Sequence, residues 1–175
     1  MYFTARDIAA IAVCSALWGV LNTLLSPIFW ELTRMPFLCD LLAFTVLILA
    51  IWWTGKFGAA SFVGVIVTVM TLMLRPTAFH MTGFLVASVV FDVATRALGY
   101  KRLFQSPVVG SAVLSVFSVL SAGISGTIIG SFFMGFKTQE AILSFAGLHA
   151  FGGLIGGMIG VITVRALIAR RVRSL

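Results

Sequence analysis

Ser125 and His149 are the two residues whose types and spacing could support covalent chemistry in this sequence. Ser125 lies in the second half of one apolar run, and His149 lies in the first half of the next run. If the two runs form an antiparallel helical hairpin, the two side chains lie at similar depth and could face one another. A histidine beside a serine hydroxyl can accept its proton and make the oxygen a nucleophile. One hypothesis for this chain is therefore acyl-transfer chemistry.

Two local patterns sharpen that hypothesis. Gly123-Ile124-Ser125-Gly126 is a GxSG sequence, and His149 begins an HxxGxxxG pattern that continues through Gly152 and Gly156. Both segments resemble the active-site segments of rhomboid intramembrane serine proteases, in which histidine activates a membrane-embedded serine. The chain departs from that family because its two motif-bearing runs are adjacent, and because it has neither the early HxxxN pattern nor the Trp-Arg pair of the first loop. A rhomboid-like protease is thus one alternative function.

The sequence gives no pattern for a metal or nucleotide site. His80 and His149 stand apart, no HxxxH pattern is present, and Cys14 and Cys39 lack the spacing of metal ligands. No glycine-rich phosphate loop follows a strand, so we expect that the chain does not bind ATP itself. We predict no metal, no cofactor and, in the favoured interpretation, no catalytic activity.

A larger set of polar and aromatic residues is expected near the outer face of the protein. Mixed aromatic and hydrogen-bonding groups suit a small, planar, polar ligand such as a heterocycle. For any one of these residues, the alternative is a simple role as an anchor at the membrane interface. The set comprises Asn22, Trp30, Glu31, Arg34, Asp40, Arg75, His80, Thr82, Ser125, Phe132, Phe133, Lys137, Gln139 and His149.

The composition predicts that these residues are positioned by membrane helices. Of the 175 residues, 61% are hydrophobic and 10% are charged, which is more apolar surface than a soluble domain of this length can bury. Runs of about 20 apolar residues are long enough to cross the bilayer. We predict an all-α integral membrane protein with one domain, residues 1–175, and six transmembrane helices at 7–29, 37–54, 57–75, 79–99, 107–134 and 142–168.

The basic residues predict the orientation of these helices. The net charge of +7 comes mostly from residues at the ends of apolar runs, which indicates control of topology and not nucleic-acid binding. If the N-terminus is cytoplasmic, the outer side holds only Arg34, Arg75 and Lys137. The inner side then holds Arg6, Lys56, Arg96, Lys101, Arg102, Arg165, Arg170, Arg171 and Arg173. Both termini are therefore predicted to be cytoplasmic, in a multi-pass protein of the cell membrane.

Small residues and one acid-base pair give further expectations. Asp92 and Arg96 are four residues apart, which predicts an intrahelical pair near the inner boundary. In the first helix, small side chains recur every three or four residues and form one stripe, at Ala5, Ala9, Ala12, Ala16, Gly19, Thr23 and Ser26. In lipid such a stripe allows close approach of backbones. It could meet a protein partner or the chain's own helices, and the sequence leaves both open.

The whole chain resembles a substrate-binding S component of an energy-coupling factor (ECF) vitamin importer. The resemblance rests on the small size, the six predicted spans, the glycine-rich last span with its basic tail, and the Ala-x-x-x-Ala of Ala12 and Ala16, extended by Ala5 and Ala9. It implies that this face docks onto a transmembrane coupling subunit driven by two cytosolic ATPases.

The resemblance also implies a vitamin or vitamin precursor as ligand, bound near the outer surface. The candidate contacts that it implies are Trp30, Glu31, Arg34, His80, Thr82, Phe132 and His149. The chain begins Met1-Tyr2-Phe3 and lacks the Met-His start of the nickel and cobalt branch, so a metal substrate is not expected. A stand-alone small-molecule carrier and a structural or assembly protein remain as further alternatives.

Overall fold

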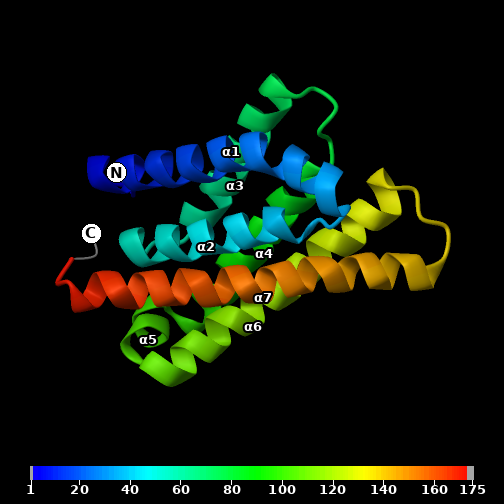
Figure 1. Ribbon diagram of the computed structural model, residues 1–175. Helices are drawn as coiled ribbons and strands as arrows, with labels where there is room; N and C mark the ends of the chain where they lie inside the picture. The colour runs from blue at the N-terminus through cyan, green and yellow to red at the C-terminus, as the bar shows by residue number, and fades with distance from the viewer. Residues whose placement is uncertain (1, 173–175) are drawn as a thin grey trace.

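The computed structural model describes residues 2–172, and every regular element in that range is a helix (Figure 1). Five helices are long and apolar enough to cross a membrane, and α3 is a shorter apolar helix. The protein is thus a multi-pass helical membrane protein. In chain order the elements are α1 (Ala5–Thr33), α2 (Phe37–Thr54), α3 (Ala59–Leu74), α4 (Met81–Leu98), α5 (Tyr100–Gln105), α6 (Pro107–Ile128), a π-helical turn η1 (Ile129–Phe133) and α7 (Gln139–Ala169).

All six apolar runs predicted as spans are helical, and the run 37–54 coincides with α2. Two features were not predicted: the short helix α5 between α4 and α6, and the π-helical turn that ends α6. The start of α1 and the end of α7 lie at the same end of the bundle (Figure 1). We call this the terminal end, and the opposite end, which holds the loop between α6 and α7, the loop end. Arg173 of the predicted basic tail lies outside the described residues.

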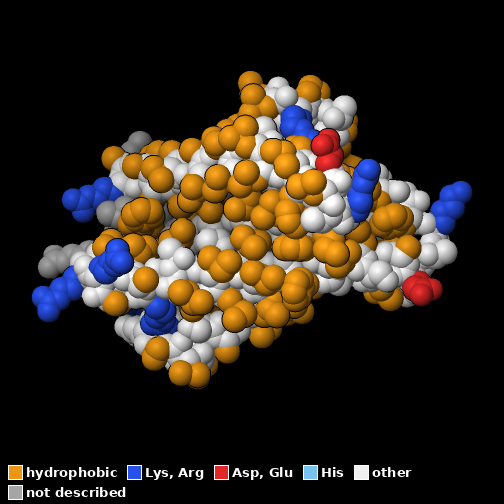
Figure 2. Space-filling view, in the orientation of Figure 1, with side chains coloured by type: hydrophobic (Ala, Val, Ile, Leu, Met, Phe, Trp, Pro, Cys, Tyr) orange, Lys and Arg blue, Asp and Glu red, His pale blue; other side chains and the backbone are white. Residues whose placement is uncertain are grey.

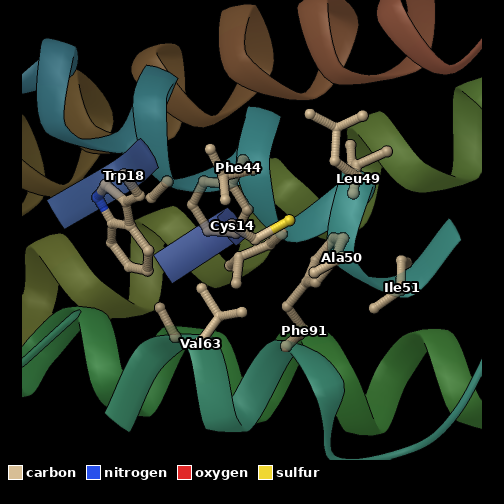
Figure 3. Close-up of a cluster of buried hydrophobic side chains, with 14 of the residues drawn as sticks. Cys14, Trp18, Phe44, Leu49, Ala50, Ile51, Val63 and Phe91 are labelled. Carbon is tan, nitrogen blue, oxygen red and sulfur yellow. The ribbon is translucent and has the colours of Figure 1, made fainter. Parts of the chain in front are cut away.

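The surface has the distribution of side chains that a bilayer requires. Hydrophobic side chains cover the middle of the bundle, and lysine and arginine side chains gather towards its two ends (Figure 2). The core is centred on α2, whose residues from Val46 to Trp52 are all buried. Around it pack Cys14 and Trp18 of α1 and Phe91 of α4 (Figure 3). An all-round apolar helix such as α2 belongs in the interior of a bundle.

Glycines on α7 allow it to pack directly against α2. A Cβ atom at Gly152 would lie 2.5 Å from the Phe37 carbonyl oxygen, and one at Gly156 would lie 2.6 Å from the Leu41 carbonyl oxygen. These distances are shorter than real Cβ contacts, so only glycine permits this approach of the two backbones. The hydroxyl of Thr45 also donates to the carbonyl oxygen of Gly156, at 3.1 Å, and links the two helices.

A second glycine face of α7 packs against α6. A Cβ atom at Gly153 would lie 2.6 Å from the Ser118 carbonyl oxygen, and one at Gly157 would lie 2.9 Å from the Ser118 hydroxyl. The last two membrane helices therefore pack together through small residues. The use of neighbouring glycines on α7 for two different partners follows from helical geometry, because adjacent residues point about 100° apart.

The predicted intrahelical pair of Asp92 and Arg96 is wrong. The buried Asp92 carboxylate accepts hydrogen bonds from the backbone N–H groups of Gly58 (3.0 Å) and Ser61 (2.9 Å), from the Ser61 hydroxyl (2.8 Å) and from the Tyr100 hydroxyl (3.1 Å). The carboxylate thus satisfies the N-terminus of α3, where a negative charge is favourable. These donors are fixed in place and exclude water, so the carboxylate pairs with them and not with the exposed Arg96 side chain.

Another acid joins α1 to the turn between α2 and α3. Asp7 closes a capping box with Thr4 at the start of α1. The same carboxylate accepts a hydrogen bond from the Lys56 ammonium group, 2.6 Å away. The Lys56 ammonium group also donates to the carbonyl oxygen of Tyr2. These contacts hold the start of α1 against the turn between α2 and α3 at the terminal end.

The contact of Gly152 and Gly156 on α7 with the α2 backbone, here called the glycine seam, predicts that two alanine substitutions differ in their effect on stability. Gly156→Ala should lower the free energy of unfolding by about 1–3 kcal/mol, because the added methyl group overlaps the α2 backbone. Gly147→Ala is the control, since open space surrounds that position, and it should be neutral or slightly stabilising. Thermal unfolding in detergent measures both variants, and equal midpoints would contradict the assigned seam.

Candidate functional site

The small-residue stripe of α1 is divided into an exposed part and a buried part. Ala5, Ala9, Ala12 and Ala16 are exposed to the surroundings of the bundle. We call these four residues the alanine edge. Gly19 is buried where the Met70 side chain of α3 fills the space that a Cβ atom would need. Towards the loop end the stripe thus packs against the chain's own helices, and towards the terminal end it is uncovered.

A buried polar cluster lies where α2, α6 and α7 meet. Nδ1 of His149 on α7 lies 2.6 Å from Oδ2 of Asp40 on α2, and these side chains are 1% and 0% exposed. On α6, Ser125 is fully buried as well. Gly126 places α6 against the imidazole, since a Cβ atom there would lie 2.9 Å from Cδ2 of His149. We call Asp40, Ser125 and His149 the polar cluster.

Each member of the polar cluster has a buried atom without a hydrogen-bond partner in residues 2–172. These atoms are Oδ1 and Oδ2 of Asp40, Oγ of Ser125, and Nδ1 and Nε2 of His149. Buried polar groups are nearly always hydrogen-bonded, because an unpartnered group forfeits its hydration. The three residues lie on helices that pack together, and Ser125 precedes the Gly126 that contacts His149, so this region is a candidate site for a ligand or a reacting group.

Aromatic rings enclose the polar cluster. The His149 ring centroid lies 4.7 Å from that of Phe145 and 5.8 Å from that of Phe84. Phe136, in the loop after η1, packs on Phe145 at 5.4 Å and thereby covers the cluster from the loop end. Trp18 packs on the far side of Phe84, and its indole N–H is also unpartnered. Flat apolar walls with a few polar atoms are typical of sites for planar ligands.

Asn22, of the predicted outer set, connects α1 to α4. Its amide approaches the sulfur of Met81 at 3.7 Å, and its Oδ1 accepts a hydrogen bond from the hydroxyl of Ser26, a residue of the small-residue stripe, at 2.8 Å. Both side chains are buried. The contact with Met81 places this part of α1 beside the start of α4.

The seven ligand contacts implied by family resemblance occupy different environments. His149 belongs to the polar cluster, and Trp30 is half-buried against the core. Glu31 and Arg34 are exposed at the end of α1 that lies towards the loop end. Phe132, in the π-helical turn, is 79% exposed and is not part of the cluster.

The remaining two, His80 and Thr82, are half-buried at the start of α4. Burial lowers the pKa of the His80 imidazole below its usual range, and the neighbouring Arg75 charge adds to this effect. His80 is therefore neutral at physiological pH. The Thr82 hydroxyl donates to the carbonyl oxygen of Phe79 and so helps to close the first turn of α4.

Asp40 and Ser125 are the members of the polar cluster that the resemblance to S components did not supply, although both belong to the predicted outer set. An acid inside an apolar run is costly, so Asp40 tends to face a partner or a polar cavity. The sequence does not give the register between α2 and α7, and for this reason it did not predict the contact between Asp40 and His149. Within residues 2–172, no group of three or more His, Cys, Asp and Glu side chains is arranged to hold a metal ion.

The fold and the polar cluster define a multi-pass helical membrane protein with an enclosed polar site. No known protein family, curated protein or solved structure matches the chain. Its function must therefore be argued from the described residues themselves.

The pair of Asp40 and His149 predicts a non-additive effect on stability. Asp40→Leu should lower the free energy of unfolding by about 3–5 kcal/mol, because it leaves the imidazole buried without its charged partner. The double variant Asp40→Leu with His149→Phe should lose much less than the sum of the two single variants. Unfolding in detergent tests this double-mutant cycle, and additive losses would show that the two side chains are not coupled.

Proposed function

We propose that the protein is the substrate-capture subunit, or S component, of an ECF-type importer, and that it binds a vitamin or vitamin precursor from outside the cell. The observation that carries this proposal is the uncovered alanine edge of α1. In this proposal a transmembrane coupling subunit docks on that edge. Two cytosolic ATPases drive the coupling subunit, and the chain itself is not an enzyme.

The alanine edge differs from the lipid-facing surface elsewhere in the bundle. The exposed face of α3, for example, carries Phe62, Ile66, Val69 and Met73, which fill the space between lipid chains. Four alanines in register instead leave a shallow, smooth surface. In a bilayer, helix association depends on such close approach of backbones and not on the release of water. The surface therefore suits a tight contact that can also separate.

The polar cluster supplies the second requirement, a place for the ligand. It lies in the half of α7 nearest the loop end, and the start of α1 and the end of α7 lie at the opposite end (Figure 1). If the termini are cytoplasmic, as the basic residues predict, the cluster lies in the outer half of the membrane. A small heterocycle with hydrogen-bond donors and acceptors would satisfy the free atoms of Asp40, Ser125 and His149 and stack on Phe145.

Entry of such a ligand requires a movement at the loop end. Phe136, in the segment that joins η1 to α7, packs on Phe145 in the second turn of α7. Gly135 of this segment has a positive φ of 64°, a conformation that glycine adopts without strain. Displacement of the Phe136 ring would expose Phe145 and then His149. Ligand binding that favours one arrangement of this segment would shift the equilibrium between closed and open forms.

Substitution of the alanine edge should separate ligand binding from transport. Ala16→Trp should reduce uptake at least about tenfold, because loss of roughly 1.4 kcal/mol in docking already has that effect. Ligand release from the denatured protein, measured by mass spectrometry, should be unchanged. Ala112→Trp is the matched control, since Ala112 is an exposed alanine on α6.

Three results would contradict the proposal. Normal uptake by Ala16→Trp would exclude docking through the alanine edge. Uptake by the purified chain in liposomes without ATPase partners would identify a stand-alone carrier. Absence of any small molecule in the denatured protein, together with no binding of added vitamins, would favour a structural or assembly role.

A second candidate function is an intramembrane serine hydrolase. It is favoured by the contact of Asp40 with Nδ1 of His149, since a carboxylate at that nitrogen orients the imidazole in Ser-His-Asp enzymes. Under this candidate, a fluorophosphonate probe should label Ser125, and Ser125→Ala should abolish labelling. Under the importer proposal the wild-type protein stays unlabelled, and the residual effect of Ser125→Ala is on ligand retention.

A further inference from the structure

A cavity of about 900 Å³ opens at the terminal end of the bundle, far along α7 from the polar cluster. The ends of α2, α4 and α7 surround it, and the short helix α5 forms one wall. In Figure 1, α5 lies beside the last turns of α7 at this end. The part of the lining that matters here consists of Trp52, Arg96, Lys101, Phe104 and Ile168.

The cavity is positively charged. Arg96 and Lys101 contribute to its lining, and no acidic side chain does. Within residues 2–172, neither cation makes an ion pair or a side-chain hydrogen bond. The nearest acid, Asp92, is occupied by the donors of Gly58, Ser61 and Tyr100. The two cations are thus available to an external anion.

Two other basic residues near this end make structural contacts. Arg165 donates to the carbonyl oxygens of Phe104 (2.9 Å) and Ser106 (2.8 Å) and so closes the connection from α5 to α6. Lys56 is paired with Asp7. Arg96 and Lys101 make no such contact in the described residues, and they are the basic residues that line the cavity.

Apolar side chains make up much of the rest of the lining, beside the polar side chains of Thr54, Tyr100 and Gln105, and lie at the level where the membrane helices end. Trp52 and Phe104 bring aromatic rings, and Ile168, on the last turn of α7, is exposed. Tryptophan and lysine or arginine at helix ends are typical of the headgroup region of a bilayer. A ligand that joins a negative headgroup to a hydrocarbon chain matches both parts of the cavity.

We propose that this cavity binds the headgroup of one anionic phospholipid, with its phosphate held between Arg96 and Lys101 and its acyl chain against the exposed apolar side chains of α7. Basic pockets between membrane helices bind such headgroups through charge. A freely dissolved phosphate would share the contacts with the cations but would leave the apolar wall unused. This inference is independent of the importer proposal, since it uses neither the alanine edge nor the polar cluster.

The experiment compares lipid binding by the purified full chain with that of two double variants. The first, Arg96→Gln with Lys101→Gln, removes both charges from the cavity. The second, Arg34→Gln with Arg75→Gln, removes two charges from the loop end and is the control. Both replaced cavity residues have exposed side chains, so the first variant should fold. Native mass spectrometry measures binding of phosphatidylglycerol and phosphatidylcholine, and thermal unfolding measures the stabilisation.

We expect phosphatidylglycerol to bind the wild-type chain and the control variant at one site and to raise their unfolding temperature. The cavity variant should bind phosphatidylglycerol about 30-fold more weakly, because it lacks the contribution that two surface cations usually make to the affinity for an anionic lipid. Phosphatidylcholine should not discriminate among the three proteins. Equal binding of phosphatidylglycerol by the cavity variant and the wild type would overturn the proposal. Stabilisation by inorganic phosphate equal to that by the lipid would also overturn it, in favour of a soluble phosphate ligand.

Discussion

The close approach of α7 to α2 is the contact on which the rest of the structure depends. Gly152 and Gly156 let the two backbones meet, and a Cβ atom at Gly152 would also lie 3.0 Å from Cβ of Asp40. One turn earlier on α7, His149 therefore lies beside the Asp40 carboxylate. Larger side chains in the seam would separate the helices and pull this pair apart. The polar cluster is thus a consequence of packing by glycine, since lipid offers no driving force from released water.

The same seam explains why a polar site is tolerated within an apolar bundle. Each of its three side chains comes from a different helix, and α6 is held against α7 by a second glycine face. The aromatic rings of Phe84 and Phe145 then fill the space around the imidazole. A carboxylate and an imidazole in contact offset part of one another's desolvation cost. The remaining unpartnered polar atoms destabilise the folded state, and such destabilising features concentrate at functional sites.

Much of the fold could be predicted from the sequence, because the signals are local. Apolar runs of membrane-spanning length, prolines at their ends and repeated glycines are properties of contiguous residues, and the six runs are helical as expected. The contacts of Asp92 and Asp40 were not predictable in this way. Asp92 contacts Gly58 and Ser61, and Asp40 contacts His149, and in both cases the partners are far apart in the sequence. These contacts depend on how the helices are aligned with one another, and a local sequence pattern does not predict that alignment. The π-helical turn alters the direction of side chains at the end of α6, which is why Phe132 faces outward.

The length of α3 has a consequence for the membrane itself. Its 16 residues extend about 24 Å at 1.5 Å per residue, which is shorter than the hydrocarbon thickness of about 30 Å. Lipids beside its exposed face must therefore compress, or the helix ends must lie below the headgroups. The Asp92 carboxylate supplies acceptors for backbone groups at one of these ends, where water would otherwise be needed. Lipids beside α3 thus meet a shorter apolar surface than lipids beside the 29-residue α1 or the 31-residue α7.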